Sequence, residues 1–260
     1  MNANGLYNGL EGYIVPGTNS GMGMGVANGA FGDPDNIISI VRDSLRIHLD
    51  PLQYTPGSST WTDLTGNGFN ATLVGSPEYN PTMGGSFTCN RTSTAQGQYI
   101  TIPNPTTTGN HSVCIWIKFN GTFSNASEVM VYGGGGVFSF RIVESTSGTI
   151  LSIIVGNSTS FINLPTTPFF VNKWFNFTLV RDGLDSNNNG INYAYLDGNL
   201  IFSQVGAGSA GNSIIGLNAA SNGTSPSLNN TYGMFLWYNR PLTPAEVRQN
   251  YNALKSRYTL

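Results

Sequence analysis

Charged residues are scarce in this chain of 260 residues. Asp, Glu, Lys and Arg together make up 9% of it, and the formal net charge is −2. Because no basic surplus is available to attract phosphates, we predict no binding to nucleic acid. Long apolar stretches are also missing. None approaches the roughly 20 residues that span a bilayer, so we predict no membrane span. No positive charge precedes Arg42, and we therefore expect no signal peptide.

Cysteine is nearly absent, since the chain has only Cys89 and Cys114. Because we expect no secretion signal, we favour two free thiols within strands. One disulfide between the two cysteines is the alternative. The sequence N-x-[ST] occurs nine times, but 31 Asn residues among many Ser and Thr produce most of these matches by chance. Glycosylation is therefore the less favoured interpretation.

Paired acidic residues are missing as well. Each of the glutamates stands alone, whereas retaining glycoside hydrolysis needs two carboxyl groups about 5 Å apart. Neither His48 nor His111 lies near a G-x-S-x-G sequence that would supply a nucleophilic serine. We therefore predict that the protein is not an enzyme and holds no organic cofactor.

Short alternating apolar segments fill most of the chain. In "LRIHLD", Leu45, Ile47 and Leu49 share one face, which is typical of a half-buried strand. Similar segments, rich in β-branched and aromatic residues, are "QYITIP", "HSVCIWIKF", "EVMVYG", "GVFSFRIV", "ILSIIVG", "SFINLP", "WFNFTLVRD", "NYAYLDGNLIFSQV", "SIIGL" and "YGMFLWYNRP". Within them, Asp197-Gly198 predicts a tight hairpin turn. The pattern predicts an all-β fold, an antiparallel jelly-roll sandwich.

The C-terminal segment has the pattern of a helix. Thr243 is a capping residue, Pro244 occupies the first helical position, and Glu246 completes a capping box. One apolar stripe follows, formed by Val247, Tyr251 and Leu254. We expect this stripe to pack on the sandwich.

Residues 1–34 differ from the rest in being rich in Gly and Asn, and we predict an N-terminal arm there, followed by one sandwich domain over residues 35–260. At the junction, Asp33 and Pro34 predict the start of a short helix with Ile37, Ile38 and Val41 on its apolar face.

The order of these segments resembles the LamG-like jelly-roll domains of the concanavalin A-like lectin and glucanase superfamily. The resemblance runs from about Leu45 to Tyr258. It rests on "LRIHLD" followed by "SSTWTDLTGNGFNATLVGSPEYN", on "WFNFTLVRDG" with "NYAYLDGNLI", and on "YNRPLTPAEVRQNY". Where the family often has Phe-Asp-Gly after an early strand, this chain has "FTCNRT". Similar domains act as binding and structural modules in extracellular, phage and large-virus proteins, so the resemblance implies a non-catalytic role.

Two features suggest ligands. "DSNNNG" places oxygen donors at the spacing of a calcium loop but lacks the final Glu, so an Asn-rich hairpin loop is the main interpretation and calcium the alternative. Its candidate ligands are Asp182, Asp185, Asn187 and Asn189. Tryptophan faces can stack on sugars, but three of the four tryptophans (Trp61, Trp116, Trp174 and Trp237) lie in predicted strands, which favours core packing.

The arm supplies the candidate partner-binding residues. Its sparse apolar groups are spaced for an extended segment lying on another subunit, and they are Leu6, Tyr7, Leu10, Tyr13, Ile14, Met22, Met24 and Phe31. Folding back on its own sandwich is the alternative.

We therefore hypothesise a virion structural protein that assembles with other capsid proteins, in a particle built in the host cytoplasm. The alternative is a carbohydrate-binding, lectin-like module, displayed on a virion or extracellular.

Overall fold

The computed structural model describes residues 39–90, 97–105, 109–120, 127–133, 138–145, 148–155, 158–163, 172–183, 189–207, 214–219 and 229–258. For strands β8 to β11 this description covers the backbone path. The predicted arm, its candidate partner-binding residues and the boundary at residue 34 lie outside these ranges. Residues Ile40–Leu260 form one compact unit.

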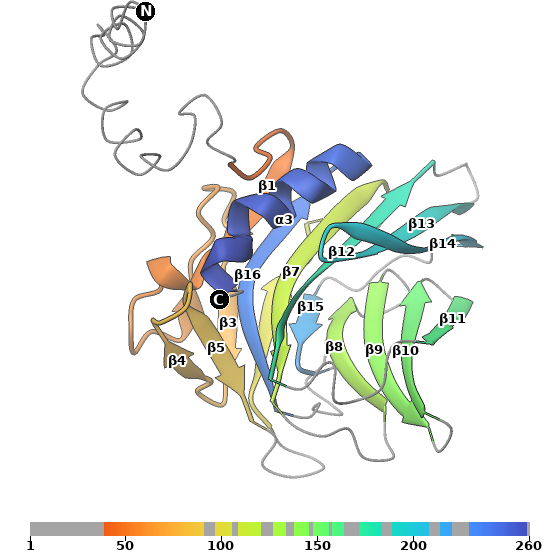
Figure 1. The fold of residues 1–260 in the computed structure, drawn as a ribbon. Helices are drawn as coiled ribbons and strands as arrows, with labels where there is room; N and C mark the ends of the chain where they lie inside the picture. The colour runs from red at the N-terminus through yellow and green to blue at the C-terminus, as the bar shows by residue number, and fades with distance from the viewer. Residues whose placement is uncertain are drawn as a thin grey trace, which may run out of the picture. The chain divides into compact units, whose positions relative to one another are not determined.

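Two antiparallel sheets of eight strands each make up this unit (Figure 1). The first sheet has the order β14 (Asn199–Ala207), β13 (Asn189–Leu196), β12 (Trp174–Asp182), β7 (His111–Phe119), β16 (Asn230–Tyr238), β5 (Ser86–Cys89) and β4 (Glu78–Asn80), and β1 (Leu45–Leu49) also pairs with β16. The second has the order β11 (Ser158–Asn163), β10 (Gly148–Val155), β9 (Phe138–Ser145), β8 (Ser127–Gly133), β15 (Ile214–Leu217), β6 (Tyr99–Pro103), β3 (Ala71–Val74) and β2 (Thr60–Trp61). The predicted all-β sandwich is confirmed.

The main core lies between the two sheets. Alternate residues of the first sheet, such as Ile115 and Phe177, meet residues of the second, such as Trp61, Ile100 and Leu217, and all are buried. Such burial of apolar area is the main stabilising term of the fold. The hairpin predicted at Asp197-Gly198 joins β13 to β14, and both residues have the positive φ (50° and 75°) that a primed turn needs.

A second core covers the other face of the first sheet. Helix α3 (Pro244–Tyr258) lies across β16, β7 and β12 on that face (Figure 1). Every residue of β16 is therefore buried, because one side of the strand meets the second sheet and the other meets the helix. The predicted capping box is present: the Thr243 N–H donates to Glu246 Oε2 (2.9 Å), and the Glu246 N–H donates to Thr243 Oγ1 (3.3 Å).

The apolar stripe of α3 is wider than the sequence pattern indicates. Val247 and Leu254 are buried and Tyr251 is half-buried, as predicted, but Asn250 and Tyr258 are buried too. The Tyr258 hydroxyl accepts from the Met234 N–H (2.9 Å). The ring lies over Gly233, where a Cβ atom would come within 2.7 Å of it, so the close approach requires glycine.

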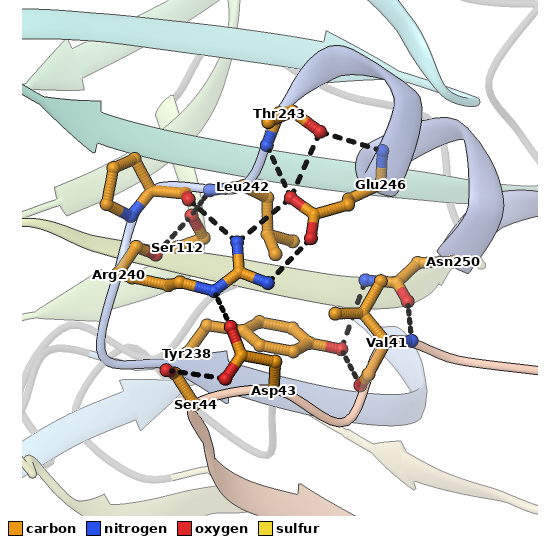
Figure 2. A network of polar contacts seen from close by, with 11 residues as sticks. Val41, Asp43, Ser44, Ser112, Tyr238, Arg240, Leu242, Thr243, Glu246 and Asn250 are labelled. Atoms are coloured by element: carbon orange, nitrogen blue, oxygen red, sulfur yellow. Dashed lines mark hydrogen bonds and ion pairs between the residues drawn. The ribbon is translucent and has the colours of Figure 1, made fainter.

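Asn250 also ties the helix to the segment before β1 (Figure 2). Its Oδ1 accepts from the Val41 N–H (2.8 Å), its Nδ2 donates to the Tyr238 hydroxyl (3.1 Å), and that hydroxyl donates to the Val41 carbonyl (3.0 Å). Both backbone groups of Val41 are thus bound by side chains. Residues 40–42 are accordingly not helical, so the short helix predicted from Pro34 was wrong there, and its first residues lie outside the described ranges.

Arg240 completes this connection, in the loop between β16 and α3 (Figure 2). Its Nε donates to Asp43 (2.6 Å), and its two terminal nitrogens donate to the carboxylate of Glu246 (2.6 and 2.9 Å). Together these groups form what we call the terminal clasp, made of Val41, Asp43, Tyr238, Arg240, Glu246 and Asn250. It joins segments about two hundred positions apart in the sequence.

Candidate functional site

A pocket of about 400 Å³ lies at the side of the sandwich where β3 and β4 meet. It is lined by Tyr54, Pro56, Gly57, Ser58, Ser59, Leu73, Ser76, Pro77 and Tyr79. These residues come from the loop after the 3-10 turn η2 (Pro51–Gln53), from β3, from the β3–β4 connection and from β4. Since β3 belongs to the second sheet and β4 is the last strand of the first, the pocket bridges the two sheets at their edges.

Two tyrosine rings form the aromatic wall of the pocket. Tyr54 and Tyr79 meet edge to face with their centroids 4.9 Å apart, and both rings contact the buried Phe87 (4.9 and 5.5 Å). Asp50 stabilises the turn that precedes the Tyr54 loop. Its side chain caps η2 by accepting from the Leu52 N–H (3.0 Å). The rings are half-buried and packed on the core, which holds their positions without a ligand.

Hydroxyl groups surround these rings. The Tyr54 hydroxyl donates to the Ser58 carbonyl (2.5 Å) and keeps its lone pairs for a further donor. The side-chain hydroxyls of Ser59, Ser76 and Tyr79 have no hydrogen-bond partner among the described residues. A pocket that combines aromatic faces with unengaged hydroxyls provides both stacking and hydrogen bonding to a polar ring.

Ser76 is held in an uncommon backbone conformation, with φ at 58°. Gln98 stabilises that turn, because its Nε2 donates to the Ser76 carbonyl (2.9 Å) while its Oε1 accepts from the Asn90 N–H (2.9 Å). A left-handed serine costs conformational energy, and such residues are frequent at binding sites. Gln98 is thus a positioning residue for the pocket.

The candidate calcium ligands are not placed in this pocket. Asp185 and Asn187 lie outside the described residues, Asn189 begins β13, and Asp182 ends β12, where its carboxylate accepts from the Gly183 N–H (2.7 Å). Within the described ranges, no three His, Cys, Asp or Glu side chains form a potential metal site. Calcium binding therefore stays a prediction.

The "WTDLTGNGFN" loop is structural. The buried Asp63 carboxylate accepts from the backbone N–H groups of His48 (2.9 Å), Thr65 (3.1 Å) and Phe69 (3.3 Å), and from the Thr65 hydroxyl (2.7 Å). Because these donors occupy both oxygens, the carboxylate holds the loop against β1 and leaves little capacity for a ligand.

The tryptophans do not form a sugar platform. Trp61, Trp116 and Trp237 are buried in the two cores, as predicted, and Trp174 packs on the Tyr258 ring (4.8 Å). Both cysteines are free and buried, in line with the favoured prediction. The tyrosine pocket was missed by the sequence analysis, since its residues are spread over positions 54–79 and follow no spacing rule.

The comparisons with known proteins agree with this architecture. Residues 94–248 match the family model Laminin_G_3, described as the concanavalin A-like lectin/glucanases superfamily, and this is more than half of the chain. The chain belongs to this superfamily. The resemblance drawn from the sequence is thereby confirmed for the concanavalin A-like fold. Among curated protein sequences, none matches the chain significantly.

Several solved structures share this concanavalin A-like fold. The binding domain of botulinum neurotoxin DC in complex with SialylT has a TM-score of 0.60 and 17% identity, covering 82% of this chain and 52% of that one. The same domain in complex with rat synaptotagmin II has a TM-score of 0.60 and 16% identity, covering 81% of this chain and 52% of that one. A structure of botulinum neurotoxin type C, whose cell entry depends on interaction with two ganglioside molecules, has a TM-score of 0.61 and 16% identity, covering 85% of this chain and 53% of that one. The chain thus spans about half the length of these proteins, and at such identities the likeness shows the fold alone. Among the described helices, none has the length and apolar character to cross a membrane.

Proposed function

We propose that this protein is a non-catalytic, lectin-like binding module that holds a saccharide in the pocket between Tyr54 and Tyr79. The observation that carries the proposal is the set of three unengaged hydroxyls, those of Ser59, Ser76 and Tyr79, beside two fixed aromatic rings. Sugars present apolar C–H faces and polar edges, which such a wall and such hydroxyls complement. The volume of about 400 Å³ lies toward the lower end of small-ligand pockets, roughly 300–1,000 Å³, and suits one or two sugar rings.

The absence of catalysis is part of the proposal. No Asp, Glu or His lines the pocket, so its lining does not supply the pair of carboxyl groups that most glycoside hydrolases use. Two proteins of the same fold support a binding role by analogy, because one was solved in complex with SialylT and cell entry of the other depends on interaction with two ganglioside molecules.

A glycan array with the full chain tests the proposal, followed by titration of any sugar that binds. Tyr79→Phe removes only the free hydroxyl and should weaken binding about 2- to 10-fold, the worth of one hydrogen bond. Tyr79→Ala removes the ring as well and should abolish detectable binding. Tyr193→Ala, at a half-buried tyrosine of β13, is the control and should leave affinity unchanged. Glycan binding that survives Tyr79→Ala would place the site elsewhere.

The virion role remains a separate hypothesis. It depends on the arm over residues 1–34 and on partners among capsid proteins, and its direct test is the composition of the native assembly that contains the protein.

A further inference from the structure

The lining of the tyrosine pocket carries no charge. None of its nine lining residues is Asp, Glu, Lys, Arg or His. In the two segments that supply most of them, residues 54–60 and 73–79, Glu78 is the sole charged residue. An acidic ligand would therefore find no cation in the pocket wall and one carboxylate on its border.

The arginine next to the pocket loop is already neutralised. Arg257 reaches the start of η2, where it donates to both oxygens of Asp50 (2.7 and 3.1 Å) and to the Gly84 carbonyl (2.7 Å). Its terminal nitrogens are committed to these partners and its Nε is buried, so the guanidinium is not available to bind a ligand carboxylate.

Backbone N–H groups are the other means of binding an anion, and three of those in the pocket loop are occupied. The N–H of Tyr54 donates to the Pro51 carbonyl (3.1 Å), that of Ser58 to the Thr55 carbonyl (3.1 Å), and that of Thr60 to Ser58 Oγ (2.9 Å). These hydrogen bonds stabilise the loop and make these three N–H groups unavailable to an anion.

Glu78 adds a repulsive charge. It lies in β4 between Pro77 and Tyr79, both of which line the pocket, and its side chain is exposed on the other side of the strand. Adjacent Cα atoms are about 3.8 Å apart, so this carboxylate lies within a Debye length of the pocket at physiological ionic strength.

We infer that the pocket selects neutral saccharides and discriminates against glycans that carry a carboxylate or sulfate. This inference rests on the proposed function, whose ligand class it narrows. The hydroxyls of the pocket can either donate hydrogen bonds to sugar hydroxyl groups or accept hydrogen bonds from them. A bound carboxylate, in contrast, would lose its hydration without gaining a charged partner.

The test compares sugars that differ by one acidic group or by one acidic residue. Lactose and 3′-sialyllactose, glucose and glucuronate, and galactose and galacturonate are titrated against the full chain at low and at physiological salt. In each pair that binds, the neutral member should bind at least tenfold more tightly. Glu78→Gln should then reduce the discrimination about twofold and Glu78→Lys about fivefold at low salt, with less change at higher salt. The affinity for the neutral members should stay unchanged in both variants.

The outcomes separate the two proposals. If acidic members bind as well as neutral ones, and Tyr79→Ala abolishes both, the neutral selectivity is wrong while the lectin-like function stands. If no member of any pair binds, and the glycan array is empty, the proposed function fails and the selectivity fails with it.

Discussion

Glu246 has two roles in the terminal clasp, as the second member of the capping box of α3 with Thr243 and as the ion-pair partner of Arg240. The guanidinium holds the pKa of this carboxyl at about 2, well below its usual 4.5, and the hydrogen bonds from Thr243 act in the same direction. A lowered pKa in the folded state means that the ionised form stabilises the protein above about pH 4.5. That contribution is lost as the pH falls through 2.

We expect Glu246→Gln to lower the free energy of unfolding by about 1 to 2 kcal/mol at pH 7, since it weakens a capping box and removes a partly exposed ion pair. Urea denaturation of both proteins from pH 7 to pH 2 measures this. The difference between them should shrink below pH 4.5, because protonated Glu resembles Gln. A difference that stayed constant over the whole range would contradict the role of the charge.

His111 makes the protein sensitive to mild acid. It is fully buried, stacks on Trp237 at 4.7 Å, and hydrogen-bonds through Nδ1 to the Gly109 carbonyl (2.8 Å). Burial lowers its pKa from 6.5 to about 3, and burial with the nearby Arg42 charge also lowers the pKa of His48. The unfolded chain therefore binds protons that the folded protein does not, and the stability falls as the pH drops from about 6.5.

For His111 the slope should reach about 1.4 kcal/mol per pH unit. The matched test is His111→Gln. This variant should be less stable than the wild type at pH 7, but the difference in the free energy of unfolding should be about 2 to 3 kcal/mol smaller at pH 4.5. The reason is that protonation of the unfolded chain at His111 destabilises only the wild type. Thermal melts at five or six pH values give the comparison. Parallel curves for the two proteins would show that His111 does not titrate in this way.

At the scale of the element, helix α3 is attached mainly by its apolar face. Leu254 is 4% exposed and lies in the cluster under the helix, whereas the neighbouring Lys255 points to solvent. We expect Leu254→Ala to cost about 2 to 4 kcal/mol, the usual range for a buried leucine in a packed core. Lys255→Ala is the control and should change the stability by less than about 0.5 kcal/mol. An unchanged melting temperature for Leu254→Ala would mean that the helix does not dock as described.

Strand prediction succeeded where segments are long enough to show alternation. All eleven strands from β6 to β16 coincide with segments identified from sequence, and so does β1. Strands β2 to β5 were missed: they have only two to four residues, too few to establish a period of two, although the four-residue β15 was found from its apolar residues. The helix stripe was incomplete for another reason: Asn250 and Tyr258 are polar or amphipathic, and only their tertiary partners bury them.

The pocket could not be predicted from these short strands either. Tyr54 and Tyr79 are 25 positions apart, and they meet only because β3 joins the second sheet through β6 while β4 joins the first through β5. Local spacing carries no information on such pairings. The "WTDLTGNG" segment, in contrast, was noticed as a family feature, and the structure supplies its reason in the hydrogen bonds of Asp63.

At the scale of the whole molecule, the predicted boundary between the N-terminal arm and the compact unit can be tested. The terminal clasp fixes the chain at Val41 and Asp43, so a protease-resistant core should begin near Ile40. Purified alone, the protein should show fast amide exchange and ready cleavage before Asp35, since the composition of residues 1–34 offers little apolar area to offset their ordering entropy. Limited proteolysis with mass spectrometry measures this. Slow exchange of the arm in the isolated monomer would oppose a role in assembly.

The terminal clasp also determines when this protein is able to fold during its synthesis. Among the described strands β1 pairs only with β16, and the Val41–Asn250 hydrogen bond spans 209 positions. A ribosome must therefore translate nearly the whole chain before the first strand acquires its neighbour, and the apolar faces of the intervening strands stay exposed in the meantime. Contacts this distant in sequence make folding slow and prone to aggregation. The yield of native protein should therefore depend on chaperones that shield these faces more than on the stability of the finished sandwich.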